Sequence, residues 1–241
     1  MEITNATALA RDLAPTGVLR ASINLGNPVL AQGTPDAPRG ITVDLARELG
    51  RRIGLPVEFR CFDAARKSYE AMATGQADLC FLAVDPAREA EVAFTAPYVH
   101  IEGMYAVPAD STLRTPDDVD HEGVRIGVKQ GSAYDLFLTR TLRHATVVRG
   151  AEGVDVFHTE KLEAAAGIRQ PLTAHVAGRP ELRLVEPAFM TIRQAVGTTR
   201  ERSPETVRFL SETVAELTAS GFVADALGRS GQDPTLAAPV A

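Results

Sequence analysis

The chain has 241 residues, of which 45% are hydrophobic and 23% charged, with a formal net charge of −6 at pH 7. This composition is typical of a globular protein, and the length allows one large domain or two lobes. No basic block offsets the negative charge, which excludes nucleic acid and anionic membranes as expected partners. No apolar run approaches the ~20 residues of a membrane-spanning helix.

Apolar runs alternate with helix-period segments, the pattern of an α/β protein. Residues 26–28 and 35–40 are a turn and a polar loop. The run at residues 79–84 is apolar throughout, which predicts a central, parallel strand. In the first half of the chain, strands are predicted at residues 19–24, 57–62, 79–84 and 103–107, and helices at residues 43–53 and 64–73.

Cap residues predict three helix starts in the second half of the chain. Thr115 and Ser203 each precede a proline and an acid, and Ser132 precedes a segment that runs to residue 143. A short terminal helix is predicted at residues 221–227. Strands are predicted at residues 124–128, 145–148, 162–168, 182–185 and 189–196.

The most informative stretch is residues 78–98. The apolar run ends at Asp85-Pro86, and Arg88 follows within one helical turn. This order predicts a guanidinium at the carboxyl edge of a sheet, where open α/β sheets bind ligands. Its fixed fork of donors suits a carboxylate. The alternative is a surface arginine that pairs with Glu89 or Glu91.

Five segments of the chain together carry a pattern: GITVDLAREL (40–49), TGQAD (74–78), DPAR (85–88), FTAPY (94–98) and RIGVKQGS (125–132). In this order they resemble the family 3 bacterial extracellular solute-binding proteins, the polar amino-acid receptors of ABC importers. The resemblance covers residues 19–228, nearly the whole chain, and each segment alone is a weak signal.

The resemblance implies a two-lobed α/β fold of the type II periplasmic-binding-protein class, with two hinge crossings. Lobe 1 is expected at residues 1–106 plus 196–241 and lobe 2 at 107–195, with hinges at 106–108 and 194–196. Hinge motion would close the lobes around a small solute. A monomer that delivers its ligand to an ABC transporter permease is expected.

The family is exported, so the resemblance implies a periplasmic or extracellular protein. Residues 1–15 lack the basic start and apolar stretch of a secretion signal. A chain that is complete as given would therefore be expected in the cytoplasm.

In the family, the arginine that matches Arg88 holds the ligand's α-carboxylate, with backbone groups of Leu82 and Ala83 beside it. The helix start at Ser132, Ala133 and Tyr134 offers N–H groups to an anion, although Ser132 also fits as a plain cap. Other expected site residues have structural alternatives. Asn24 and Asn27 fit a turn, Phe62 fits core packing, and Asp85 fits an N-cap better than an ammonium partner.

One departure from the family pattern concerns the ligand's amine. Amino-acid receptors carry an aspartate after the strand that matches residues 164–168, whereas this chain has Arg169 and Gln170. An arginine there would repel an ammonium. Ala83 also replaces the family's Ser or Thr. The hypothesis that follows is a small organic anion without a free amine.

Two other functions stay open. A lyase similar to cyclohexadienyl (prephenate or arogenate) dehydratase would need a general acid, and its candidates are Asp85, Asp135 and Glu163. A cytoplasmic ligand-sensing module is the third class. No cofactor is expected, and the scattered histidines indicate no metal site. Cys61 and Cys80 are expected as free thiols at the ends of two neighbouring strands.

Overall fold

The computed structural model describes residues 3–239, with side chains from residue 7 onward. The chain forms two compact units. Unit 1 contains the residues up to His100 and those from Arg193 onward, and unit 2 is Ile101–Ile192. These divisions come earlier in the chain than the expected ones at 106/107 and 195/196. Within residues 3–239, every helix is too short or too polar to cross a bilayer.

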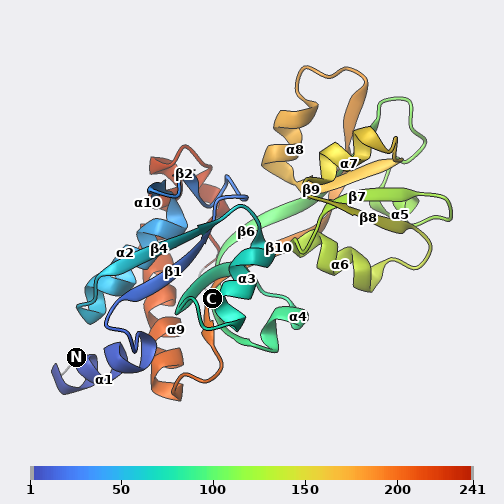
Figure 1. Cartoon of the computed structure of the whole chain (residues 1–241). Helices are drawn as coiled ribbons and strands as arrows, with labels where there is room; N and C mark the ends of the chain where they lie inside the picture. The colour runs from blue at the N-terminus through green and yellow to red at the C-terminus, as the bar shows by residue number, and fades with distance from the viewer. Residues whose placement is uncertain (1–2, 240–241) are drawn as a thin grey trace. The chain divides into compact units, whose positions relative to one another are not determined.

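Unit 1 is built on a sheet with the strand order β4-β1-β5-β10 (Figure 1). β1 lies parallel to β4 and β5, and β10 lies antiparallel to β5. The strands are β1 (Leu19–Asn24), β4 (Val57–Phe62), β5 (Leu79–Ala83) and β10 (Leu182–Thr199). The helices are α1 (Ile3–Leu13), α2 (Ile41–Ile53), α3 (Ala65–Ala73), α4 (Pro86–Glu89), α9 (Pro204–Ala219) and α10 (Phe222–Arg229). A hairpin of β2 (Gln32–Thr34) and β3 (Ala37–Arg39) and a 3-10 turn (Pro234–Leu236) complete the unit.

The strands of unit 2 follow the order β6-β9-β7-β8. β7 is parallel to β8 and β9, and β6 is antiparallel to β9. The strands are β6 (Val92–Pro108), β7 (Arg125–Lys129), β8 (Thr146–Gly150) and β9 (Ala164–Ile168). The helices are α5 (Pro116–Val119), α6 (Ala133–Thr141), α7 (Gly153–Thr159) and α8 (Arg169–Val176). The unit boundaries fall inside β6 and β10, so both strands run through both units.

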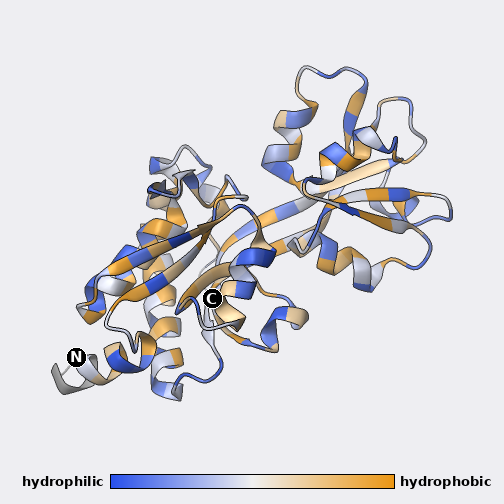
Figure 2. Ribbon diagram, viewed as in Figure 1, coloured by the Kyte–Doolittle hydropathy of each residue, from blue (hydrophilic) through white to orange (hydrophobic). Residues whose placement is uncertain are grey.

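Hydrophobic and hydrophilic residues alternate along the helices, including α2 and α9 (Figure 2). All five residues of β5 are buried, and the strand lies between β1 and β10. The prediction of a central strand is therefore confirmed, although only its β1 neighbour is parallel. An apolar strand in this place buries both of its faces.

The three predicted helix caps are confirmed. Ser132 Oγ accepts a hydrogen bond from Asp135 N, and Ser203 Oγ accepts one from Thr206 N. Thr115 forms a capping box with Asp118. These local signals depend only on residues three positions apart.

Other elements were missed or predicted too short. No helix is predicted from the sequence at α1, α7 or α8, and no hairpin at β2–β3, whereas the Asp85 cap of the turn at α4 is expected. The long strands β6 and β10 were expected as shorter pieces, because Pro97 and Pro187 interrupt their patterns. Long-range pairing in the sheet outweighs this local signal.

Both cysteines are free thiols, but their strands are not neighbours as expected, because β1 lies between β4 and β5. Burial raises the pKa of Cys80 to about 12, and this thiol is inaccessible to solvent. Burial, together with the charge of Asp36, also raises the pKa of the half-buried Cys61.

The thiolate is the reactive form of a cysteine. We therefore expect iodoacetamide at pH 8 to modify Cys61 alone in the native protein, as read by peptide mass spectrometry. In urea both should react, and fast native labelling of Cys80 would contradict this burial.

Candidate functional site

Several predicted site residues of unit 1 lie at one edge of its sheet. Asn24, Phe62 and Ala83 are the last residues of β1, β4 and β5, and Asn24 pairs with Phe62 in the strand register. Because these three strands are parallel, their carboxyl ends meet at one edge. This is the edge at which open α/β sheets bind ligands.

Arg88 lies on the short helix that follows β5. The Asp85 carboxylate caps this helix by accepting a hydrogen bond from Ala87 N at 2.9 Å, and Pro86 fits its first position. Arg88 is only 3% exposed, and its Nη1 donates to the Ala83 carbonyl at 3.1 Å. Burial lowers the pKa of Arg88, against the opposing charge of Asp85. The expected alternative, a surface arginine, is therefore wrong.

The side chains of the other predicted residues in unit 1 have structural tasks. Asn24 Oδ1 accepts from Gly26 N at 3.0 Å, and Asn27 Oδ1 accepts from Val29 N at 3.2 Å, so both stabilise the turn. Phe62 packs against the core cluster that contains Leu82. Since the Leu82 side chain is buried in this core, only its backbone can face a ligand.

The unit 2 residues begin with the helix start at Ser132, Ala133 and Tyr134. The Ser132 cap occupies the N–H of Asp135, so anion binding here would depend on the N–H groups of Ala133 and Tyr134. Tyr134 is buried, which raises its pKa to about 12. The phenol therefore stays protonated at neutral pH.

The hypothesis of a ligand without an amine assumed that Arg169 has no acidic partner. In the structure, Arg169 has two. Its Nε donates to Glu102, and its Nη1 and Nη2 donate to Glu186 at 2.7 and 3.0 Å. This hydrogen bonding lowers the pKa of Glu186. One positive and two negative charges meet here, so the argument that Arg169 repels an ammonium is wrong.

Gln170, the next residue, carries an unsatisfied polar atom. Its Oε1 is buried and has no hydrogen-bond partner among the described residues. A buried acceptor without a donor costs about 1–3 kcal/mol. A donor such as an ammonium or amide would satisfy it.

The three candidate general acids are all engaged in other interactions. Glu163 binds Arg125 through both carboxylate oxygens, which lowers its pKa and keeps it ionised at neutral pH. Asp135 binds Arg149 at 3.0 Å, and Asp85 caps α4. Among the described residues, no group of three His, Cys, Asp or Glu side chains could hold a metal ion.

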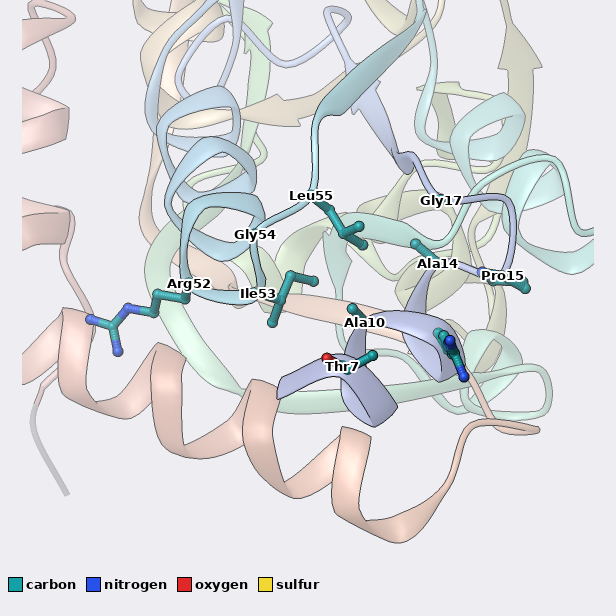
Figure 3. Close-up of a pocket in the computed structure, with 10 residues that line it drawn as sticks. Thr7, Ala10, Ala14, Pro15, Gly17, Arg52, Ile53, Gly54 and Leu55 are labelled. Carbon is teal, nitrogen blue, oxygen red and sulfur yellow. The ribbon is translucent and has the colours of Figure 1, made fainter. Parts of the chain in front are cut away.

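Unit 1 also has an open pocket of about 550 Å³ between α1 and the end of α2 (Figure 3). Ala10, Ile53 and Leu55 point into it, while Arg52 points away. Gly17 and Leu55 precede β1 and β4, so the pocket lies at the amino ends of the strands. This is the edge opposite to Asn24 and Phe62.

Comparisons with known proteins agree on family and fold, although a search of curated proteins found no match. Holo ArgBP from T. maritima is 20% identical, with a TM-score of 0.69 over 86% of this chain and 92% of that one. AbpA from Streptococcus pneumoniae, bound to L-arginine, is 16% identical, with a TM-score of 0.73 over 90% and 96%. The ancestral amino-acid-binding protein AncCDT-1, a precursor of cyclohexadienyl dehydratase, is 17% identical, with a TM-score of 0.73 over 92% and 98%.

These structures confirm the two-lobed α/β fold of type II periplasmic binding proteins. The family model described as bacterial extracellular solute-binding proteins, family 3, matches residues 24–229. Together with the five motifs, this match confirms the expected resemblance. The chain belongs to the family 3 bacterial extracellular solute-binding proteins.

Proposed function

We propose that this protein binds an amino acid through its α-carboxylate and delivers it to an ABC transporter. The observation that carries the proposal is Arg88, a buried guanidinium after the central strand of unit 1. One of its nitrogens is anchored to the Ala83 carbonyl, which orients the fork. A desolvated, oriented arginine binds a carboxylate strongly and with fixed geometry.

The residues that are expected near the ligand's amine favour an amino acid over an anion that lacks an amine. The two negative charges of Glu102 and Glu186 exceed the single positive charge of Arg169. Gln170 Oε1 is in addition a buried hydrogen-bond acceptor without a partner among the described residues. Negative charge and a free acceptor favour an ammonium. The solved relatives point the same way, since AbpA is bound to L-arginine and a putative ABC-transporter binding component from Wolinella succinogenes is complexed with lysine. That Ser132, Ala133, Tyr134, Arg169 and Gln170 share a site with Arg88 stays a prediction.

Calorimetry with matched ligands tests the proposal. A thermal-shift screen of the twenty amino acids and of small organic acids first finds the ligand, since bound ligand raises the apparent stability. Titrations then compare each hit with analogues that lack one group. For arginine these are agmatine, without the carboxylate, and 5-guanidinopentanoate, without the α-amine; for lysine they are cadaverine and 6-aminohexanoate.

Loss of the carboxylate is expected to weaken binding at least about 30-fold, because a buried charge then lacks its partner. Loss of the amine should also weaken binding. Equal affinity for the decarboxylated analogue would contradict the role of a carboxylate. Tight binding of succinate with no response to any amino acid would restore the hypothesis of an anion without an amine.

A further inference from the structure

Two histidines that the sequence separates by 17 positions meet on unit 2. His158 is near the end of α7 and His175 near the end of α8, and their Nε2 atoms lie 3.0 Å apart. His158 is exposed and His175 half-exposed. The Phe157 and His158 rings pack at an interplanar angle of 65°, with centroids 4.9 Å apart, which helps to orient the imidazole.

The spacing of the two nitrogens matches that of two ligands on one metal ion. Metal–nitrogen bonds are about 2.0–2.1 Å long, so an N···N distance of 3.0 Å gives an N–metal–N angle of about 91–97°. Adjacent positions of square-planar or octahedral ions subtend about 90°. A tetrahedral ion would need the nitrogens about 3.3–3.4 Å apart.

The surroundings leave room for the remaining ligands. Both rings reach the surface, so water can complete the coordination. Asp155, one turn before His158 on α7, contributes a favourable negative charge at His175, whereas Arg179 after α8 contributes a positive one. Without metal, one Nε2 donates to the other. Binding therefore requires that the donor ring carry its proton on Nδ1 instead, and that both rings turn until their Nε2 lone pairs converge on the ion.

We propose that His158 and His175 form a two-histidine site for a late first-row divalent metal ion, with Cu²⁺ bound more tightly than Ni²⁺. This order follows from the angle and from the intrinsic affinities of these ions for imidazole nitrogen. The proposal is independent of the amino-acid site, because its evidence lies wholly on α7 and α8. Sequence patterns do not predict this pair, since the two histidines come from different helices.

Titration with Cu²⁺ and Ni²⁺ tests the site. The protein should be untagged and should carry Cys61→Ser, so that this partly exposed thiol does not take the ion. Isothermal titration in a weakly competing buffer gives the affinity, and electron paramagnetic resonance of the Cu²⁺ complex reports the nitrogen ligands. His158→Asn and His175→Gln remove one ligand each, and His144→Ala is the control, an exposed histidine of the same unit.

Each ligand variant is expected to weaken Cu²⁺ binding at least about tenfold and to remove one nitrogen from the spectrum. The double variant should bind no more tightly than the weaker single variant, since both imidazole ligands are then lost. His144→Ala should leave affinity and spectrum unchanged. Unchanged spectra in both ligand variants, or an equal loss in His144→Ala, would overturn the proposal; circular dichroism checks that each variant is folded.

Discussion

Replacing Arg88 with alanine is expected to weaken binding of the amino-acid ligand at least about 30-fold. Removing one partner of a buried, hydrogen-bonded charge pair costs about 2–5 kcal/mol, or about 30- to 4,000-fold in affinity. Arg88 is 3% exposed, so little water screens the interaction. Calorimetry of the variant against the ligand found in the screen measures the effect.

Three comparisons separate binding from folding. Arg88→Lys keeps the charge but loses the fork, so it should recover only part of the affinity. Arg60→Ala removes a half-exposed arginine of unit 1 that pairs with Glu58, and should leave binding unchanged. The decarboxylated ligand should bind Arg88→Ala and the unmodified protein almost equally. If Arg88→Ala is folded and binds the intact ligand as the unmodified protein does, the proposed function is wrong.

Asp78→Ala is expected to lower the free energy of unfolding by about 3–5 kcal/mol, the usual effect of breaking a buried ion pair. The Asp78 side chain is fully buried. Its oxygens accept from Arg20 N and Nε at 2.9 Å, from Arg20 Nη2 at 2.7 Å and from Arg202 Nη2 at 3.3 Å. Alanine would leave two arginines without this partner. The Asp78 carbonyl also accepts from Thr198 Oγ1 at 2.8 Å, a contact that the substitution keeps.

Unit 2 provides a matched control for Asp78. Arg125 donates to Glu163 through its N, Nε and Nη2 in the same pattern, and Glu163 also directly precedes a strand. That pair is exposed, at 42% and 39% of the two side chains, so water replaces the lost contacts. Glu163→Ala should therefore cost at most about 1 kcal/mol. Urea unfolding of both variants measures the difference between their free energies of unfolding. Similar losses of stability would show that burial does not determine how much these two ion pairs contribute.

Local patterns along the chain predict an α/β protein, and the five family-like segments predict its two-lobed class, whereas the region of the site stays a prediction. The caps at Ser132 and Ser203 act over three residues, and the uniformly apolar β5 reveals its own burial. The position of Arg88, just past a buried strand, follows from the same short-range order. The match to the family over residues 24–229 agrees with the predicted family and fold.

Contacts between residues that are far apart in the chain could not be predicted from local patterns. Arg169 looked like a free cation because Glu102 and Glu186 lie on β6 and β10, distant in sequence. His158 and His175 looked scattered for the same reason. A side chain's charge environment depends on which strands and helices pack beside it, and that follows from sheet order and register. The tertiary structure alone therefore reveals the polarity around Arg169 and the paired imidazoles, because both arise from contacts between elements that no local pattern encodes.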